Sequence, residues 1–316
     1  MKLQTQIPIG SEKYDQIDYN SNVLLLGSCF AQNIGSKFNY FKFQHTINPF
    51  GILFHSTAIE RLVTKAINEE GFTEDDIFNL DERWHCFDAH SDLSASSKED
   101  ILGRLNDAVS QTHRQILEAT HVVITLGTAW VYRHIERDKI VANCHKVPQK
   151  KFLKELLSVE EITASLEAII QLVRSLNPKA AFIFTLSPVR HLKDGFVENK
   201  RSKAHALSAI HNVVDRRQRQ YYFPAYEIMM DELRDYRFYK DDMIHPNTLA
   251  IDYIWNAFVN TWIHKDAYAV MDKVDFVQRG LHHRPVNENS EAHQLFLEKI
   301  EDAKQQLRAD IQHITF

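Results

Sequence analysis

Short apolar runs alternating with amphipathic stretches are the feature that most constrains the fold of this 316-residue chain. Mostly apolar residues fill positions 22–26, 121–126 and 180–186. Apolar residues recur at helical spacing through positions 101–117 and 162–173. Uninterrupted apolar strands separated by helices are typical of a parallel sheet that is covered by helices on both faces. We therefore predict an α/β fold with a central, mostly parallel sheet.

The remaining pattern extends this alternation and divides the chain in two. A last amphipathic stripe, from Phe296 to Ile311, follows a loop at positions 282–285. We predict one α/β domain over residues 1–265, followed at 266–316 by a loop and a helical extension that packs on the body or at an interface. The further elements that we expect are helices at 30–38, 57–67 and 207–214, and strands at 38–47 and 221–223.

Composition and charge exclude several classes of protein. The chain is 44% hydrophobic and 25% charged, with a net charge of −5, so it has no basic field to hold nucleic acid or anionic lipid. No window has the roughly 18 consecutive apolar residues that a membrane span needs, and the first ten residues lack the apolar region of a secretory signal. The three cysteines do not suggest a disulfide framework. We expect a soluble, cytoplasmic protein.

The turn after the first predicted strand is a candidate nucleophile site. In parallel sheets the ligand lies beyond the carboxyl ends of the strands, where Gly27-Ser28-Cys29 stands. A glycine permits a sharp turn, and the start of the following helix offers free N–H groups and a positive dipole end. These groups could hold an oxyanion and favour a thiolate. The simpler alternative is that Ser28 only caps the helix and Cys29 is a small buried apolar residue.

A second candidate lies near the end of the predicted domain. Asp242-Met243-Ile244-His245 precedes a helix-like apolar pattern. An aspartate three residues before a histidine can accept a hydrogen bond from one ring nitrogen, which leaves the other nitrogen free to act as a general base. Alone the motif is weak, because a histidine beside a proline is often a cap or a surface residue. Its pairing with a nucleophile turn is more specific.

Several segments together resemble one known family. Gly27-Ser28-Cys29-Phe30-Ala31 spells the motif of the GSCFA domain family, which is grouped with the SGNH-hydrolase superfamily. The resemblance covers roughly residues 20–260. The other segments that carry it are Asn48-Pro49-Phe50-Gly51, residues 84–91, residues 125–130, Asn143-Cys144-His145-Lys146, Ser187-Pro188-Val189-Arg190 and Asp242-Met243-Ile244-His245.

The resemblance implies a fold, a chemistry and a set of residues. It implies a three-layer flavodoxin-like α/β fold and hydrolysis or transfer of an ester-linked acyl group, without a metal or other cofactor. Carried over to this chain, the glycine of the second superfamily block is Gly51. The last block is Asp242 with His245.

Two departures from the superfamily pattern leave parts of the site open. Where the superfamily has Gly-Asp-Ser, this chain has Ser28 at the aspartate position and Cys29 at the nucleophile position. Register favours Cys29 over Ser28, and a thiolate would also suit acyl transfer through a thioester. The third block reads Gly127-Thr128-Ala129, without the asparagine that donates to the oxyanion. Thr128 or Asn143 are the candidates to replace it.

Other polar groups have competing interpretations. Cys86-x3-His90 and Cys144-His145 do not have the spacing of paired zinc ligands, so we predict no metal site. We expect His90, Asn143 and His145 to line the pocket or hold its loops together. Arg190, just beyond a strand, is a candidate substrate-binding group or a structural ion-pair partner.

Two functions from different classes fit this sequence. The first is an esterase or acyltransferase that acts on a small-molecule or glycan acyl ester, such as a sugar or a cell-envelope precursor. The second is a non-catalytic binding or scaffold protein that keeps the fold and has lost the chemistry, which the missing third-block asparagine suggests. The C-terminal helix is a candidate contact between copies of the chain in a homo-oligomer.

Overall fold

A five-stranded parallel sheet forms the centre of the molecule. The computed structural model describes residues 5–316. The strands follow the order β2-β1-β5-β9-β10, and every neighbouring pair is parallel. This is the strand order of flavodoxin-like folds, whose binding sites lie beyond the carboxyl ends of the strands where the order reverses. The strands are β1 (Asn22–Gly27), β2 (Gln44–Ile47), β5 (His121–Leu126), β9 (Ala181–Leu186) and β10 (Gln220–Tyr222).

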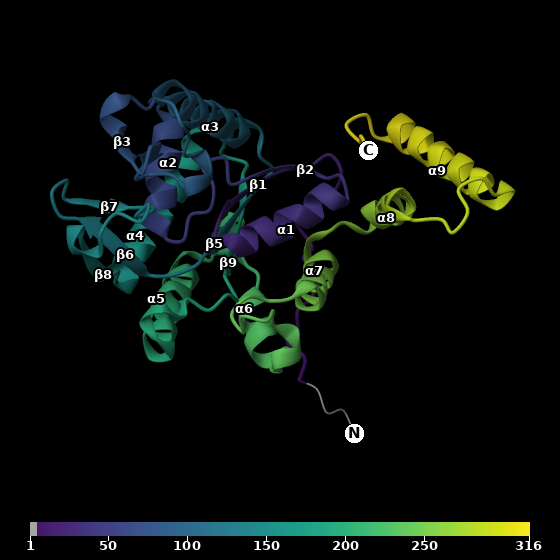
Figure 1. The fold of residues 1–316 in the computed structure, drawn as a ribbon. Coiled ribbons are helices and arrows are strands. Elements are labelled where there is room, and N and C mark those ends of the chain that lie inside the picture. Colours follow the sequence, from purple (N-terminus) through teal and green to yellow (C-terminus); the bar gives the residue numbers. More distant parts are fainter. Residues whose placement is uncertain (1–4) are drawn as a thin grey trace.

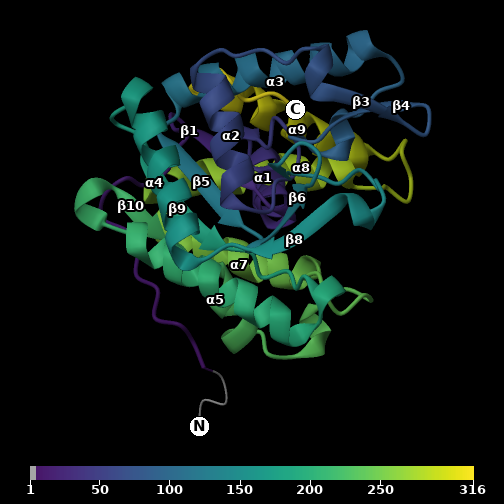
Figure 2. The same ribbon diagram turned by 90° about the vertical axis from the view of Figure 1, so that its left-hand side faces the viewer.

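Helices cover both faces of the sheet, and the strand residues alternate between two apolar cores. Leu24 and Leu26 pack with α2, α3, α4 and α5, whereas Val23 and Leu25 pack with α1 and α7. Figure 2 shows α2 and α4 on the near side of the sheet and α8 (Tyr268–His282) and α9 (Glu291–Asp310) on the far side. The predicted three-layer α/β fold is confirmed. The helices are α1 (Cys29–Tyr40), α2 (Ser56–Ile67), α3 (Lys98–Glu118), α4 (Val159–Leu176), α5 (Phe196–Val213) and α7 (Thr248–Trp262).

Two small antiparallel sheets are inserted into this frame and were not expected from the sequence. Their strands are short and partly exposed, so their side chains lack the uninterrupted apolar pattern that marked the central strands. Both lie on the side of the molecule that carries α2 (Figure 1). The first pairs β3 (Ile77–Leu80) with β4 (Arg83–Cys86), and the second has the order β7-β6-β8, with β6 (Trp130–His134), β7 (Lys139–Val141) and β8 (Phe152–Leu156).

The C-terminal extension packs on the body through α8 (Tyr268–His282) and α9 (Glu291–Asp310). The hydroxyl of Tyr40 on α1 donates to Asp275 at 2.8 Å, and the amide of Gln278 donates to the carbonyl of Tyr40 at 2.9 Å. Ile300 and Leu307 of α9 are buried in the core that contains α1. The boundary at 265/266 and the predicted homo-oligomer stay predictions.

One predicted element is only partly confirmed. Residues 38–47 were expected to form a strand, but α1 continues to Tyr40 and β2 begins only at Gln44. Lys42, with φ of 63°, makes the tight connection between them. The aromatic residues that suggested a strand instead pack on a helix face, since the Phe38 ring lies 5.4 Å from that of Trp255. Helix packing therefore decided this segment against its strand propensity.

The helices and the amino-terminal segment bear on the predictions about a membrane span and a secretory signal. In residues 5–316, none of the helices combines the length and the apolar character needed to cross a bilayer. The first four residues of the segment in which we expect no secretory signal lie outside the described part of the chain.

Candidate active site

The turn between β1 and α1 stands at the carboxyl edge of the sheet, beside β5. Gly27 has φ of 129°, and a Cβ atom there would lie 2.1 Å from the carbonyl oxygen of Thr125. The Ser28 N–H donates to that same oxygen at 3.0 Å. Only glycine therefore fits between the two strands at this position. The close approach holds the residues that follow, Ser28 and Cys29, at the edge of the sheet.

Ser28 and Cys29 differ in exposure and in hydrogen bonding. Ser28 is completely buried, and its Oγ accepts from the Phe30 N–H at 3.3 Å, so it is the N-cap of α1. Cys29 is the first residue of the helix and is partly exposed. The serine thus has the capping role that we weighed for it, and the thiol is the more accessible of the two candidate nucleophiles.

Opposing influences act on the Cys29 thiol. Burial raises its pKa above the ordinary value, and this effect outweighs the others. The charge of Lys203, the backbone N–H groups of Cys29 and Phe30, and the charge of Lys240 all lower the pKa. The N–H groups act as a helix N-terminus does on any nearby anion.

Asp242 and His245 form the hydrogen-bonded pair that the motif predicted. Asp242 Oδ2 lies 2.7 Å from His245 Nδ1, and Oδ1 accepts from the N–H groups of Ile244 and His245 at 2.9 Å. These backbone bonds, followed by the bond from the ring, hold the pKa of Asp242 at about 2. The carboxylate fixes the orientation of the imidazole. Within residues 5–316, Nε2 of His245 makes no hydrogen bond, so it is free to exchange a proton.

Arg190, in the loop that follows β9, contacts the turn that carries Asp242 and His245. Its guanidinium lies 4.4 Å from the centre of the Tyr239 ring and donates to the carbonyl of Met243 at 3.4 Å. The Lys240 N–H closes the turn by donating to the carbonyl of His245 at 2.8 Å. Arg190 therefore contacts the segment that carries His245, and a role in substrate binding stays a prediction.

Lys203 of α5 is a buried charge that the sequence reasoning missed. Its Nζ donates to the carbonyl oxygens of Gly127, at 2.8 Å, and Ser187, at 2.6 Å. Burial lowers its pKa to about 7, against a smaller effect of Cys29 that raises it. The signal was present in the sequence, because Lys203 falls four and seven residues before Leu207 and Ile210 on the apolar stripe of this helix.

His191, on the same loop as Arg190, is a half-buried polar group. Its pKa is lowered to about 3, mainly by burial and also by the charges of Lys203 and His245. Its Nε2 has no hydrogen-bond partner within residues 5–316. The ring packs edge-on against Phe54, with 5.3 Å between the ring centres. His191 therefore lies near enough to Lys203 and His245 for their charges to lower its pKa, and its imidazole is neutral.

The backbone N–H groups of Gly51, Gly127 and Thr128 are already engaged in the fold. The N–H of Gly51 donates to the carbonyl of Asn48 at 2.7 Å, and a Cβ at Gly51 would lie 2.3 Å from that of His90. The N–H groups of Gly127 and Thr128 both donate to the carbonyl of Phe54, at 2.8 and 3.0 Å. These positions therefore shape the loops around the site through their backbone.

Side chains in these loops also form hydrogen bonds within the fold. Thr128 Oγ1 lies 2.8 Å from Ser202 Oγ and accepts from the Trp130 N–H at 3.0 Å. Asn48, at the end of β2, accepts from the Gly27 N–H at 2.8 Å through Oδ1 and so supports the nucleophile turn. Sequence reasoning singled out the Asn48–Gly51 segment for its glycine and overlooked this asparagine.

His90, Asn143 and His145 lie in the loops of the inserted sheets. Asn143 and His145 line a cavity of about 440 Å³, and Asn143 also lines a neighbouring cavity of about 240 Å³ that reaches Thr128 and His191. Burial lowers the pKa of His145 to about 4, and its Nε2 lies 2.6 Å from the carbonyl oxygen of Cys86. His90 caps a short helical turn. None of the three makes a hydrogen bond with Cys29 or His245.

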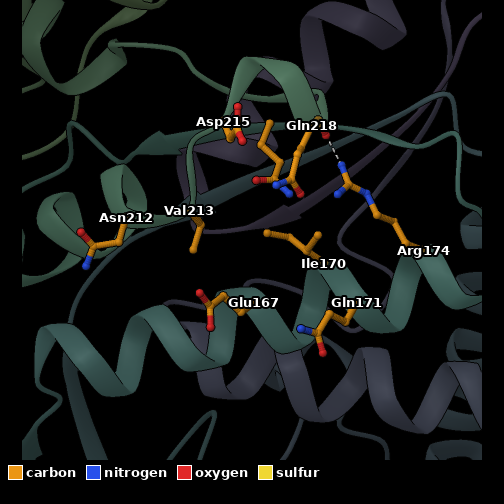
Figure 3. A pocket seen from close by; sticks show the side chains of 9 residues that line it. Glu167, Ile170, Gln171, Arg174, Asn212, Val213, Asp215 and Gln218 are labelled. Atoms are coloured by element: carbon orange, nitrogen blue, oxygen red, sulfur yellow. Dashed lines mark hydrogen bonds between the residues drawn. The ribbon is translucent and has the colours of Figure 1, made fainter.

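A larger cavity, of about 590 Å³, lies elsewhere in the fold. It is lined by residues of α4 and of the segment that leads into β10, among them Glu167 and Asp215 (Figure 3). Arg174 donates there to the carbonyl of Gln218. This is the amino end of β10, whereas ligands of parallel sheets bind beyond the carboxyl ends. We therefore assign the candidate site to the turn at Cys29. In residues 5–316, no three His, Cys, Asp or Glu side chains are grouped to hold a metal ion.

Two family models match most of this chain. The model of the GSCFA family matches residues 22–258, and that of the GSCFA domain protein, C-terminal domain, matches residues 274–316. A search of curated proteins found no match. Among solved structures, a carbohydrate esterase of family 3 from Talaromyces cellulolyticus is similar at 10% identity and a TM-score of 0.37, over 80% of this chain and 99% of that one.

Proposed function

The chain belongs to the GSCFA family, and on that premise we propose that it is an acyl-ester hydrolase or acyltransferase with Cys29 as nucleophile. The observation that carries the proposal is an accessible thiol at the start of α1, in a chain that also has a histidine held by a carboxylate. Both stand in segments that follow the strand ends of a flavodoxin-like sheet. A nucleophile and an oriented base are the minimum equipment for nucleophilic acyl transfer.

The choice of Cys29 over Ser28 rests on access. An attacking atom must reach the substrate carbonyl, and Ser28 is completely buried with its hydroxyl turned to the Phe30 N–H. Cys29 is partly exposed, and its own N–H is the first of the helix, so it has no acceptor within α1. That N–H is our candidate for the oxyanion donor that the missing asparagine leaves open.

Each residue then has a separate part in the reaction. The Cys29 thiolate attacks the ester carbonyl, the carbon–oxygen bond of the ester breaks, and a thioester forms on the enzyme. His245 takes the thiol proton of Cys29 through Nε2 and passes it to the departing alcohol. It later takes a proton from the acceptor, which is water in hydrolysis or a hydroxyl in transfer, and returns it to the Cys29 sulfur when the thioester breaks. Asp242 keeps the imidazole in the orientation that exposes Nε2. We propose a sugar or a cell-envelope precursor as the substrate class.

Turnover of p-nitrophenyl acetate by matched variants tests this proposal. We expect Cys29→Ala to lose turnover and to form no acetyl adduct detectable by intact-protein mass spectrometry. Ser28→Ala is the control, because it removes the cap of α1 at a cost of roughly 1 kcal/mol in unfolding free energy but keeps the thiol. The proposal fails if Cys29→Ala retains wild-type turnover, or if the wild-type protein neither turns over the ester nor becomes acetylated.

A scaffold without catalysis is the second candidate function. The observation that favours it is the engagement of the Gly51, Gly127 and Thr128 N–H groups within the fold, which removes donors that the superfamily pattern would use. It predicts that p-nitrophenyl acetate leaves the protein unmodified and that Cys29→Ala changes neither acetylation nor stability beyond a small packing effect. The same experiment therefore separates the two functions.

A further inference from the structure

We propose that the cavity of about 240 Å³ beside Thr128 and His191 binds a single sugar ring, which is the alcohol part of the ester. The inference rests on the proposed function, because acyl transfer needs a place for the alcohol that departs from the ester or accepts the acyl group. It adds the residues that hold this alcohol and narrows its chemistry to one neutral, hydroxylated ring. Binding of the ring can be measured without turnover, so the two proposals can fail separately.

Three loops at the carboxyl edge of the sheet contribute to this cavity. Phe54 comes from the loop after β2, Thr128 from the loop after β5 and His191 from the loop after β9. In the sheet, β1 stands between β2 and β5, and the turn after β1 carries Cys29. The cavity is therefore at the same edge of the sheet as the thiol, between loops that follow both neighbours of β1.

Hydrogen bonds join the wall of the cavity to the nucleophile turn. The Leu53 N–H donates to the carbonyl of Gly27 at 2.9 Å. The next residue is Phe54, whose carbonyl accepts from the N–H groups of Gly127 and Thr128 at 2.8 and 3.0 Å. This two-residue segment thus crosses from the end of β1 to the end of β5. A ligand that packs on Phe54 keeps a fixed position relative to the nucleophile turn.

Aromatic side chains line the cavity. Trp130 and Tyr132 stand two residues apart on β6, so both side chains lie on the same face of that strand. Phe54 adds a third ring from the loop after β2. Lys154 lies 4.0 Å from the centre of the Trp130 ring and is paired with Asp194, so the indole is held in place. Rigid aromatic walls of this kind pack well against the C–H groups of a sugar ring.

The size and charge of the cavity favour one neutral ring. Its volume is below the roughly 300–1,000 Å³ of sites for drug-sized ligands, so it has room for about one ring. Among the described residues that line it, the charged side chains are one cation, Lys193, and one anion, Asp194. Burial lowers the pKa of His55 to about 4 and that of His191 to about 3, so both imidazoles are neutral at neutral pH. A charged ligand would bring an unbalanced charge into this setting.

Polar atoms without partners in the cavity match the hydroxyls of such a ring. Asn143 accepts from the His145 N–H at 2.9 Å through Oδ1, and within residues 5–316 its Nδ2 makes no hydrogen bond. In the same part of the chain the Tyr132 hydroxyl makes none, and neither does Nε2 of His191. Sugar hydroxyls both donate and accept, so they can bond to all three groups. An acyl chain would cut these groups off from water without pairing them, which costs free energy.

Protection of Cys144 from alkylation tests the site. Cys144 is partly exposed and lines the cavity, so a bound ring should cover its thiol. Full-length Cys29→Ala protein is treated with iodoacetamide at about pH 9. Roughly one in a hundred Cys144 thiols is ionised there, since burial raises the pKa of this thiol to about 11.

The rate of labelling is compared with and without a sugar. Peptide mass spectrometry follows Cys144 in the presence of methyl glucoside, of methyl N-acetylglucosaminide, or of glycerol as a control that has hydroxyls but no ring. A sugar that binds with a Kd of about 1 mM should slow the labelling roughly tenfold at about 10 mM. Glycerol at the same concentration should leave the rate unchanged.

Matched variants locate the ring in the cavity. Asn143→Asp keeps the Oδ1 that bonds to the His145 N–H but replaces the free donor with an acceptor, so affinity for the sugar should fall at least about fivefold. Tyr132→Leu should lose the protection, whereas Tyr14→Leu, at a residue that is 77% exposed and outside the cavity, should keep it. Rates with and without sugar are compared within each variant. Labelling of Cys86, which is buried in the folded protein, identifies a variant that has not folded.

Three results would overturn the proposal: protection by neither sugar, equal protection by glycerol, or full protection in both Asn143→Asp and Tyr132→Leu. The first two need no variant of the cavity to fold. Turnover of p-nitrophenyl acetate by the wild type without protection by either sugar would count against the sugar site only. Intact protection in a protein whose wild type does not turn over the ester would count against the proposed function only.

Discussion

At Gly27, the addition of a single methyl group as a side chain would strain the fold. Its φ of 129° and the 2.1 Å approach that a Cβ would make to the Thr125 carbonyl oxygen act together. A side chain at this position would introduce conformational strain and steric overlap, and both would disturb the hydrogen bond from the Ser28 N–H to the same oxygen. The first strand can end beside β5 only because this side chain is absent.

We predict that Gly27→Ala lowers the free energy of unfolding by on the order of 3 kcal/mol, from backbone strain and overpacking together. Urea unfolding measures this change. Gly103→Ala is the matched control, because no atom lies within 4 Å of a Cβ placed at this position in α3. There the greater helix propensity of alanine should stabilise the protein by about 0.5–1 kcal/mol. Equal effects of the two substitutions would contradict the steric explanation.

Asp242 governs the histidine through charge. We predict that Asp242→Asn lowers kcat/KM for p-nitrophenyl acetate on the order of 10²- to 10⁴-fold, because the amide no longer holds the imidazole as a carboxylate does. The pKa of Asp242 is depressed from 3.8 to about 2, so its interactions are present above pH 3.8 and are lost as pH falls through about 2. Loss of wild-type activity above pH 3.8 must therefore come from another group. Unchanged kcat/KM in Asp242→Asn would remove Asp242 from the mechanism.

At the scale of elements, the docking of α9 on α8 depends on a glycine. A Cβ at Gly280 would lie 2.4 Å from Cδ1 and 2.9 Å from Cγ1 of Ile300. The two helices approach closely at this point because the glycine has no side chain. Ile300 and Leu307 thereby become buried, whereas Leu295 and Leu297 of the same helix stay 52% and 43% exposed.

We predict that Gly280→Leu loosens α9 while the central sheet keeps its stability. Hydrogen exchange followed by mass spectrometry should show faster exchange in peptides of α9 and unchanged exchange in β1 and β5. The double variant Gly280→Leu/Ile300→Ala should restore part of the protection, because the shorter side chain makes room. Equal protection of α9 in wild type and Gly280→Leu would show that this contact does not hold the helix.

Across the whole molecule, several buried histidines make stability depend on pH. His55 is buried, and the pKa values of His55 and His145 are lowered to about 4 and that of His191 to about 3, in each case mainly by burial. Because these folded-state values lie below the ordinary 6.5, the unfolded chain binds more protons as pH falls from 6.5 toward 4. The contribution of these neutral histidines to the free energy of unfolding is complete above pH 6.5 and is lost as pH falls toward 4.

We predict that the free energy of unfolding, measured with urea, decreases steadily from pH 6.5 to pH 4. His55→Gln should decrease less steeply over the same interval, because one of the groups that take up protons on unfolding is gone. The absolute stability of the variant is not the test, since the substitution also changes packing. A flat profile in the wild type between pH 6.5 and pH 4 would contradict the burial of these imidazoles.

The layered fold follows from information that is local in the sequence. Apolar runs such as 121–126 and 180–186 indicate buried parallel strands, because a strand without alternating polar residues has both of its faces covered by other elements. The segment 38–47 shows where local information ends, since its aromatic residues suit a strand equally well and only the packing of Phe38 on α7 decides for helix. The inserted antiparallel sheets escaped prediction because their short, half-exposed strands carry no strong period.

The sequence by itself determined the central sheet, the turn at Gly27-Ser28-Cys29 and the bonded pair of Asp242 and His245, because each depends on residues that are close along the chain. Only the tertiary structure decided what surrounds the thiol. It buried Ser28 as a cap, engaged the N–H groups of Gly127 and Thr128 and brought Lys203 to the strand ends. Strand register and helix packing make those contacts, and neither can be predicted from any single segment of the sequence.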